Sequence, residues 1–323
     1  MNRYLCAAMT LFAALPSVGL AQGYPGKPIS LVTQFAPGST GDTLCRIMAE
    51  SLKEVTGQSV IVDNRAGAGG VVAAEFVVRA APDGQTLLVG TTGTQIMRVH
   101  LAKNSSFDPV RDFTPITQVG ETPTLWVAHP AFGSNSFREL IDYAKANPGR
   151  LTYGTSGIGS PHHLSGELVS LIAGVSLIHV PYKASAQALQ DTIAGQLNTT
   201  FAISGLVVPA VKAGKVKALA VVRGQRFKAL QDVPTVGEVV SGFETPPTWT
   251  GLFGPANMSA PLLTRVHADV VKALNAQAVR TRLSEQHFEV MTNESPAAFA
   301  AQIRREIDLV GKIVKGAGIK PNE

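Results

Sequence analysis

The sequence contains little cysteine, few aromatic residues and no run of basic residues. Of its 323 residues two are cysteines, and aromatic residues make up 6%. A nucleic-acid surface needs a stripe of Lys and Arg, usually interleaved with stacking rings. Here the formal net charge of +5 is scattered along the chain. We therefore expect no nucleic-acid partner, and we expect the charge to lie on solvated faces.

Residues 1–21 have the pattern of a secretory signal peptide. Arg3 gives a positive start, residues 5–15 are apolar, and the small residues Gly19 and Ala21 place the cleavage site after Ala21. A buried N-terminal helix is the alternative, but the charged flank and the small residues at the end argue against it. We therefore expect an exported, periplasmic protein.

The rest of the chain has neither a disulfide nor a second long apolar run. Cys6 would leave with the signal peptide, so Cys45 remains alone and no intramolecular disulfide can form. We interpret Cys45 as a small buried core residue. No other run of about 18 apolar residues occurs, which is the length that a membrane span needs. With 45% apolar and 16% charged residues, the mature chain is predicted to be globular.

Residues 29–42, ISLVTQFAPGSTGD, predict a strand, a tight polar turn and the start of a helix. The apolar β-branched run suits a buried strand, Pro37 and Gly38 end it, and Ser39, Thr40 and Asp42 are of the types that cap helices. Unpaired backbone N–H groups at a helix start suit an anion, above all a carboxylate. The alternative is an ordinary capped helix with no ligand.

The same plan recurs along the chain and predicts two α/β domains. Residues 59–63 and 86–90 read as further strands, which favours a parallel sheet with helices on its faces. Chain crossings near Pro123 and Pro246 would give domain 1 residues 22–123 and 247–323, and domain 2 residues 124–246. Two long helices, residues 261–283 and 296–314, are predicted to pack on the first sheet with no strand between them. A double crossing forms a hinge, and the cleft beside it is the default binding site.

A second polar turn, residues 155–160, precedes another helix start. Ser160 suits the cap and Pro161 the first helical position. Two helix starts from different domains that face one cleft would hold a carboxylate from both sides. This interpretation predicts a receptor for a small organic acid, with no cofactor and no metal.

An enzyme is the main alternative, as a secreted serine hydrolase that uses Ser160 and His163. The G-x-S-x-G elbow of such enzymes is absent, and no acidic partner for the histidine is evident. His162 and His163 are adjacent, so they face different directions on a helix and form a poor metal pair. We expect no catalytic residue. A structural or adhesive protein is a third alternative, disfavoured by the lack of repeats.

Several motifs occur in a fixed order along the chain. They are Tyr24-Pro25-x-Lys27-Pro28-Ile29, Phe35-x-Pro37-Gly38-Ser39-x-x-Asp42, Val62-Asp63-Asn64-Arg65-x-Gly67-Ala68-Gly69-Gly70, Tyr153-Gly154-x-Ser156-Gly157-x-Gly159-Ser160-x-x-His163-Leu164, Val180-Pro181-Tyr182-Lys183 and Trp249-x-Gly251-Leu252-Phe253-x-Pro255. This set resembles the Bug family, the solute-binding proteins of tripartite tricarboxylate transporters. The resemblance covers essentially the whole mature chain. It implies a two-domain type II periplasmic-binding-protein fold. It also implies that the protein is a monomer whose partner is a set of membrane transporter subunits or a sensor kinase.

The resemblance also implies which residues bind the ligand. They lie on the first loop, after the third strand, on the second loop and at two further turns: Phe35, Pro37, Gly38, Ser39, Thr40 and Asp42; Thr91 and Thr92; Ser156, Gly159, Ser160 and His163; and Ala184 and Ser204. Ala184 and Ser204 depart from the family. The family usually has glycine at the position of Ala184, and it often has aspartate at the position of Ser204. Without that aspartate the pocket loses a negative charge, which favours a plain organic acid over an amino acid.

Overall fold

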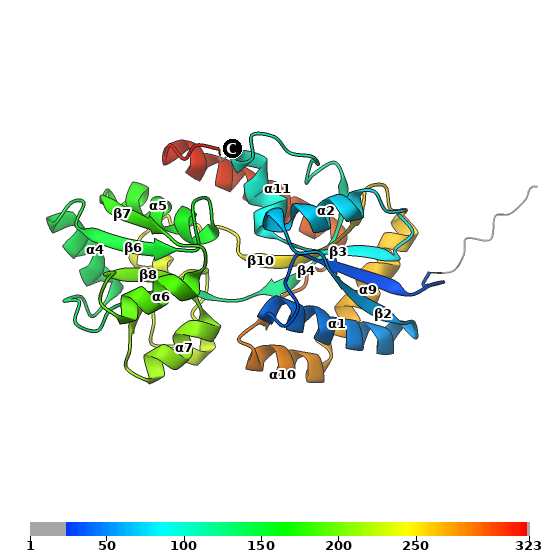
Figure 1. Ribbon diagram of the computed structural model, residues 1–323, viewed down its shortest axis with the longest axis horizontal. Helices are drawn as coiled ribbons and strands as arrows, with labels where there is room; N and C mark the ends of the chain where they lie inside the picture. Colours follow the sequence, from blue (N-terminus) through cyan, green and yellow to red (C-terminus); the bar gives the residue numbers. More distant parts are fainter. Residues whose placement is uncertain (1–23, 322–323) are drawn as a thin grey trace, which may run out of the picture.

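The computed structural model describes residues 24–321, which form two α/β lobes side by side (Figure 1). The predicted signal peptide, residues 1–21, lies outside the described residues, as does Cys6. Within the described part, every helix is either too short or too polar to cross the apolar layer of a bilayer.

The first lobe is built on a six-stranded sheet with strand order β11-β4-β10-β3-β1-β2. β1 runs parallel to β2 and β3, as predicted, whereas β10 runs antiparallel to both β3 and β4. The parallel order predicted from the first three strands is therefore confirmed for them, while the sheet as a whole is mixed. β10 enters from the other lobe, and so it crosses the sheet in the opposite direction. The strands are β1 (Ile29–Thr33), β2 (Val60–Asn64), β3 (Thr86–Thr91), β4 (Phe113–Glu121), β10 (Trp249–Pro255) and β11 (Glu289–Val290).

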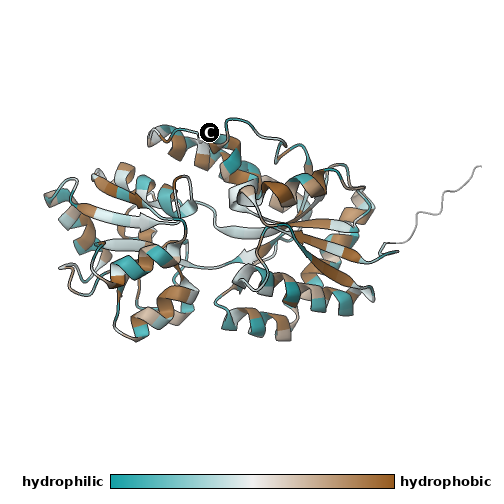
Figure 2. Ribbon diagram, viewed as in Figure 1, coloured by the Kyte–Doolittle hydropathy of each residue, from teal (hydrophilic) through white to brown (hydrophobic). Residues whose placement is uncertain are grey.

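Helices cover both faces of this sheet. One buried cluster joins the sheet to α1, α9 and α10, and a second cluster joins its other face to α2, α3 and α11. Figure 2 shows the apolar strands enclosed between helices whose polar residues face outward. The helices are α1 (Thr40–Thr56), η1 (Ala68–Gly70), α2 (Val71–Val78), η2 (Gly93–Met97), α3 (Arg98–Leu101), α9 (Ala260–Asn275), α10 (Gln277–Glu285) and α11 (Pro296–Gly316).

The second lobe has a five-stranded sheet with order β7-β6-β8-β5-β9, again between two layers of helices. β6 is parallel to β7 and β8, and β5 is antiparallel to β8 and β9. The strands are β5 (Thr124–Ala128), β6 (Leu151–Thr155), β7 (Leu177–Pro181), β8 (Thr199–Ile203) and β9 (Lys217–Val221). The helices are α4 (Phe137–Ala146), α5 (Pro161–Ala173), α6 (Ser185–Ile193), α7 (Ser204–Lys212), η3 (Lys228–Leu230) and α8 (Val236–Val239).

Two chain crossings and one helix join the lobes. β4 continues through Pro123 into β5, and residues 243–248 return the chain to β10. The Ser204 N–H donates to the Pro123 carbonyl at 2.8 Å, which ties the first crossing to the second sheet. The C-terminal turns of α11 reach over the second lobe and contact α5, with Leu164 and Val314 in one buried cluster (Figure 1). The lobes are therefore linked on one side of the cleft.

Helix α1 forms as its sequence predicts. Ser39 adopts an extended conformation and its hydroxyl accepts the Asp42 N–H, while Gly57 at φ 72° ends the helix in the left-handed conformation. Cys45 faces inward, is 0% exposed, and burial raises the pKa of its thiol to about 12. It is thus a core residue with an unreactive, protonated thiol.

The C-terminal part differs from the prediction in two ways. The predicted helix over residues 261–283 breaks at Ala276, which takes an extended ψ of 132° and separates α9 from α10. In addition, a short strand, β11, lies between α10 and α11 and pairs with β4. The break turns α10 toward the cleft, where it packs against α1. Helical periodicity continues across Ala276, so it gave no signal for this bend.

Candidate ligand-binding site

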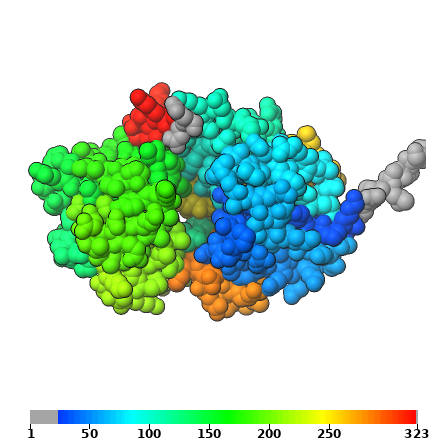
Figure 3. Space-filling view, viewed as in Figure 1, coloured from blue at the N-terminus to red at the C-terminus, as the bar shows by residue number. Residues whose placement is uncertain are grey.

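A cavity of about 440 Å³ lies between the two lobes. The space-filling view shows the hollow between the lobes, with the orange α10 region at its lower edge (Figure 3). The residues that line it come from both lobes and both crossings: Phe35, Thr40, Gly41, Leu44, Thr91, Thr92, Gly93, Thr122, Thr124, Ser156, Pro161, His162, Ile203, Thr248, Trp249, Thr250, Leu283, Gln286 and Phe288. None of these residues carries a full charge at neutral pH. An anion in this cavity is therefore held by dipoles and hydroxyl groups.

Helix starts from opposite lobes face this cavity. Thr40 and Gly41 are the first residues of α1, and Pro161 and His162 are the first residues of α5. The first N–H groups of a helix have no intrahelical partner and lie at the positive end of its dipole. Pro161 has no N–H, and the His163 and Leu164 N–H groups donate to Ser160, so the donor that the start of α5 offers to a ligand is the His162 N–H. This arrangement is chemically suited to an anion.

The two capping serines support these helix starts from behind. The Ser39 hydroxyl accepts the Asp42 N–H at 3.3 Å. The Ser160 hydroxyl accepts the His163 N–H at 3.2 Å and donates to the Gly157 carbonyl at 2.7 Å. Neither serine lines the cavity. Their hydroxyls fix the loops that carry the helix starts.

Asp42 organises the first loop from a buried position. Its carboxylate accepts the Gly38 N–H at 2.9 Å, Arg46 Nε at 2.8 Å and Asn64 Nδ2 at 2.8 Å. Asn64 also donates to the Phe35 carbonyl at 3.0 Å. The hydrogen bond from Arg46, and then that from Gly38, lower the Asp42 pKa to about 2. Asp42 is thus an ionised brace for the loop and not part of the cavity wall.

The ring of Phe35 lies directly on Gly41. A Cβ atom at position 41 would lie 2.3 Å from the Phe35 ring, which no real contact permits. Glycine at this position therefore lets an aromatic ring cover the start of α1 at the edge of the cavity. Phe35 and Gly41 both line the cavity.

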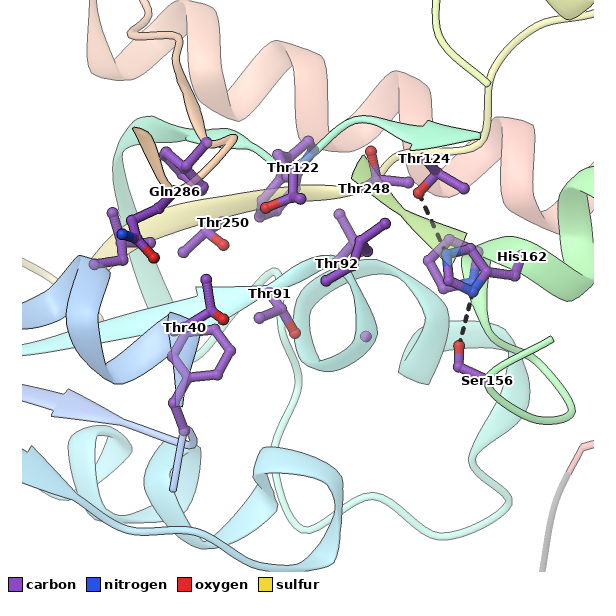
Figure 4. A pocket seen from close by; sticks show the side chains of 18 of the residues that line it. Thr40, Thr91, Thr92, Thr122, Thr124, Ser156, His162, Thr248, Thr250 and Gln286 are labelled. Atoms are coloured by element: carbon purple, nitrogen blue, oxygen red, sulfur yellow. Dashed lines mark hydrogen bonds between the residues drawn. The ribbon is translucent and has the colours of Figure 1, made fainter. Parts of the chain in front are cut away.

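His162 forms the polar end of the cavity in the second lobe (Figure 4). Its Nδ1 lies 3.0 Å from Ser156 Oγ, and its Nε2 lies 3.3 Å from Thr124 Oγ1. Burial lowers the pKa of His162 to about 4, so the ring is neutral at pH 7. A neutral imidazole donates through one nitrogen and accepts through the other, and two hydroxyls can match either assignment.

This buried histidine makes the stability depend on pH. In the unfolded chain His162 takes up a proton near pH 6.5, whereas in the folded chain it does so only near pH 4. Between these values the unfolded state binds more protons, so the free energy of unfolding falls as pH decreases. We expect His162→Gln to remove about 3 kcal/mol of this decrease between pH 7 and pH 4. Urea titrations at several pH values measure it, and parallel pH profiles for the wild type and the variant would contradict it.

The structure brings together five of the residues predicted for the site: Phe35, Thr40, Thr91, Thr92 and Ser156 all line the cavity. The remaining predicted residues lie outside the lining: Pro37, Gly38, Ser39, Asp42, Gly159, Ser160, His163, Ala184 and Ser204. Pro37 and Gly38 are exposed in the first loop, and Ala184 is exposed before α6. Ser204 is buried and its hydroxyl donates to the His287 carbonyl at 3.3 Å, a contact between the lobes.

His163 points away from the cavity into a second hollow beside the C-terminal residues. Its ring stacks on His179 with centroids 4.0 Å apart, and its Nδ1 accepts the Gly159 N–H at 3.1 Å. The other ring nitrogen faces Glu167 at 3.6 Å. No hydrogen bond joins this ring to the Ser160 hydroxyl among the described contacts. The structure therefore does not support the serine hydrolase built on Ser160 and His163.

Sequence reasoning missed a large part of the cavity wall. Threonines on either side of both chain crossings line it: Thr122, Thr124, Thr248 and Thr250. Because these threonines lie beside the chain crossings predicted from the sequence, they could have been predicted as lining residues. Leu283 of α10 and the following Gln286 and Phe288 could not have been predicted in this way, because they reach the cavity only through the bend at Ala276.

Comparison with known proteins agrees with this geometry. A family model described as tripartite tricarboxylate transporter family receptor matches residues 44–319. The chain belongs to this receptor family. Its relatives include a UPF0065 protein of Bordetella pertussis, 32% identical over 301 residues that cover 93% of each chain. Protein BugT of the same organism is 28% identical over 322 residues that cover 98% of each chain. The predicted Bug-family resemblance is thereby confirmed.

Solved structures of related receptors share the fold. Rpa4515 of R. palustris, solved with adipate, is 33% identical, with a TM-score of 0.78 over 93% of this chain and 100% of its own. MatC of Rhodopseudomonas palustris, solved with bound malate, is 33% identical, with a TM-score of 0.73 over 90% of this chain and 100% of its own. The predicted two-lobed α/β fold of a periplasmic solute-binding protein is confirmed. Family members of this kind are receptors and not enzymes.

Proposed function

We propose that this receptor captures a small organic carboxylate in the cavity between its lobes and delivers it to the membrane subunits of a tripartite tricarboxylate transporter. The observation that carries the proposal is the convergence of α1 and α5 on one cavity from opposite lobes, among threonine hydroxyls and without charged lining residues. The adipate and malate found in two related structures support a carboxylate as the ligand class.

The recognition energy comes from backbone donors and hydroxyls. A hydrogen bond to a charged group contributes about 1.5–3 kcal/mol, so four of them support micromolar affinity after the entropy lost on binding. The threonines Thr40, Thr91 and Thr92 stand beside these donors. Because dipoles inside a cleft are screened little by salt, affinity should fall only modestly as ionic strength rises.

The remaining parts of the proposal follow from the sequence. Residues 1–21 direct the chain to the periplasm and are cleaved, and the mature receptor acts as a monomer with no catalytic activity and no cofactor or metal. Residues 22–123 and 247–323 form one domain and residues 124–246 the other, with the crossings as the hinge. A sensor-kinase periplasmic domain is the alternative partner that would receive the loaded receptor.

Thr40→Pro tests whether backbone donors hold the carboxylate. Thr40 is the first residue of α1, a position where proline is compatible with the helix, and Ser39 has the extended φ of −76° and ψ of 164° that a residue before proline needs. The variant removes one N–H and one hydroxyl while the helix remains. We expect it to lower affinity by at least about tenfold, and Thr40→Ala, which keeps the N–H, to lower it less.

The measurement is isothermal titration with pentanoate, glutarate, heptanoate, pimelate, benzoate and terephthalate. Arg46→Gln is the control, because Arg46 is exposed, bonds to Asp42 and does not line the cavity. It should change affinity by less than about threefold. Loss of binding in Arg46→Gln together with full binding in Thr40→Pro would mean that an ion pair holds the ligand. Absence of binding for all these acids, with no acid released from the purified protein, would overturn the proposed function.

A further inference from the structure

His162 is an ionisable side chain in an otherwise uncharged cavity. It lies at the second-lobe end, between Ser156 and Thr124, as Figure 4 shows. The other described residues that line the cavity carry hydroxyl, amide, indole or hydrocarbon side chains, or are glycine. Within the described part of the chain, His162 is therefore the one lining residue whose charge can change near neutral pH.

The two hydrogen bonds of the His162 ring limit what its neighbours offer to a ligand. Nδ1 lies 3.0 Å from Ser156 Oγ, and Nε2 lies 3.3 Å from Thr124 Oγ1. A neutral imidazole accepts through one nitrogen, so one of these hydroxyls must donate its only proton to the ring. Neither hydroxyl has another partner among the described contacts. Hence one hydroxyl of the pair, and not both, keeps its O–H free for a ligand.

A protonated ring removes this limit. Both nitrogens then carry N–H groups, both hydroxyls accept from them, and each hydroxyl can donate its own proton elsewhere. Ser156 and Thr124 both line the cavity, so their protons become available to an anion inside it. Protonation of His162 thus adds one donor and one positive charge to this end of the cavity. Both changes favour a carboxylate.

The elements around His162 supply no fixed charge of their own to this end of the cavity. His162 packs against β5, β8 and the loop 156–160. These three segments carry no ionisable side chain. On α5, His163 and Glu167 face the second hollow, and Tyr153 of β6 donates its proton to Glu167. An anion in the cavity is thus the counter-charge that an imidazolium at this position meets.

We propose that the receptor takes up a proton at His162 together with the carboxylate, and therefore binds organic acids more tightly in mildly acidic surroundings. This inference rests on the proposed function, because the carboxylate at the start of α5 is the counter-charge. In the empty cavity, burial lowers the pKa of His162 to about 4. A carboxylate beside the ring raises that pKa, so the loaded receptor holds more protons than the empty one between about pH 5 and pH 7. By linkage, affinity rises as pH falls through this range.

Isothermal titration at pH 5.0 and pH 7.5 with the tightest-binding of the six acids in the affinity test measures this coupling. After correction for the ionised fraction of the acid, the wild type should bind at least about fivefold more tightly at pH 5.0. His162→Gln offers the two hydroxyls a donor and an acceptor but takes up no proton, so its affinity should differ by less than about twofold between the two pH values. His163→Gln is the matched control. His163 is the neighbour on the same helix but faces the second hollow, so this variant should keep the wild-type pH profile.

Two further measurements detect the proton itself. Titration at pH 6.0 in MES and in Bis-Tris, which differ in ionisation enthalpy, gives the number of protons taken up with each acid. We expect the wild type to take up at least about 0.3 proton more than His162→Gln. An NMR titration of the histidine ring Cε1–H signals in the wild type needs no variant, and the midpoint of His162 should rise when the acid is bound.

The outcomes separate this coupling from the proposed function. Equal wild-type affinity at both pH values, without proton uptake, overturns the coupling and leaves a carboxylate receptor in place. A pH dependence that persists in folded His162→Gln assigns the proton to another group and overturns the role of His162. If that variant does not fold, an unmoved NMR midpoint of His162 overturns that role instead. Absence of binding for all six acids, with no acid released from the purified protein, overturns the proposed function and this inference together.

Discussion

Asp42→Ala should weaken carboxylate binding by about 100-fold, although Asp42 does not touch the cavity. Its carboxylate holds the Gly38 N–H and Asn64, and Asn64 in turn holds the Phe35 carbonyl. Removing the carboxylate leaves these donors without their charged acceptor, and each lost hydrogen bond costs about 1.5–3 kcal/mol. The loop that positions Phe35 and the start of α1 then loses its brace, so the ligand must order it on binding.

Isothermal titration with the tightest-binding probe acid measures this effect. Asp42→Asn is the informative intermediate, because it keeps one acceptor oxygen but loses the charge that attracts Arg46. Since the Asp42 pKa is about 2, the wild-type carboxylate stays ionised from pH 8 down to pH 4, and its contribution to affinity should not vary in that range. Wild-type affinity in Asp42→Ala would mean that the loop keeps its shape without this carboxylate.

Trp126→Ala should lower the free energy of unfolding by about 4 kcal/mol. Trp126 lies in β5 and is 0% exposed. Its ring centroid is 4.3 Å from that of Phe201 and 5.1 Å from that of Phe137. Truncation removes these contacts and leaves a cavity in a core that the two helix layers prevent from collapsing. Trp126→Phe should lower stability much less, because the indole N–H has no hydrogen-bond partner among the described residues, and its loss leaves no acceptor unpaired.

Urea unfolding followed by circular dichroism measures the loss. The chain has two tryptophans, so in Trp126→Ala all tryptophan fluorescence comes from Trp249, in β10 of the first lobe. If the lobes unfold as one unit, the Trp249 signal shifts together with the circular dichroism signal. If they unfold separately, only circular dichroism shifts, and the stability must be assigned to each lobe by itself. An unchanged unfolding midpoint by both signals would contradict the predicted core role of Trp126.

The helix starts could be predicted from the sequence because they depend on residues that are only a few positions apart. Ser39 and Ser160 cap α1 and α5 through bonds to residues three positions later, and Pro161 suits a first helical turn in any context. The apolar runs that form β1 and β3 lie at the positions that the sequence predicted. Such features need no distant partner, which is why the order of strands, turns and helices could be read from the residues and matched to a receptor family.

Only the tertiary structure decided which side chains face the ligand. His162 and His163 are neighbours on α5, yet the helical rotation between them turns His162 into the cavity and His163 toward His179. From the sequence, Asp42 is predicted as a helix-cap residue and, by the family resemblance, as a ligand contact; only the tertiary structure places Arg46 and Asn64 around its carboxylate. The sequence determined where the chain turns and caps; packing of distant segments, including the bend at Ala276 that brings α10 beneath α1, determined what the cleft presents.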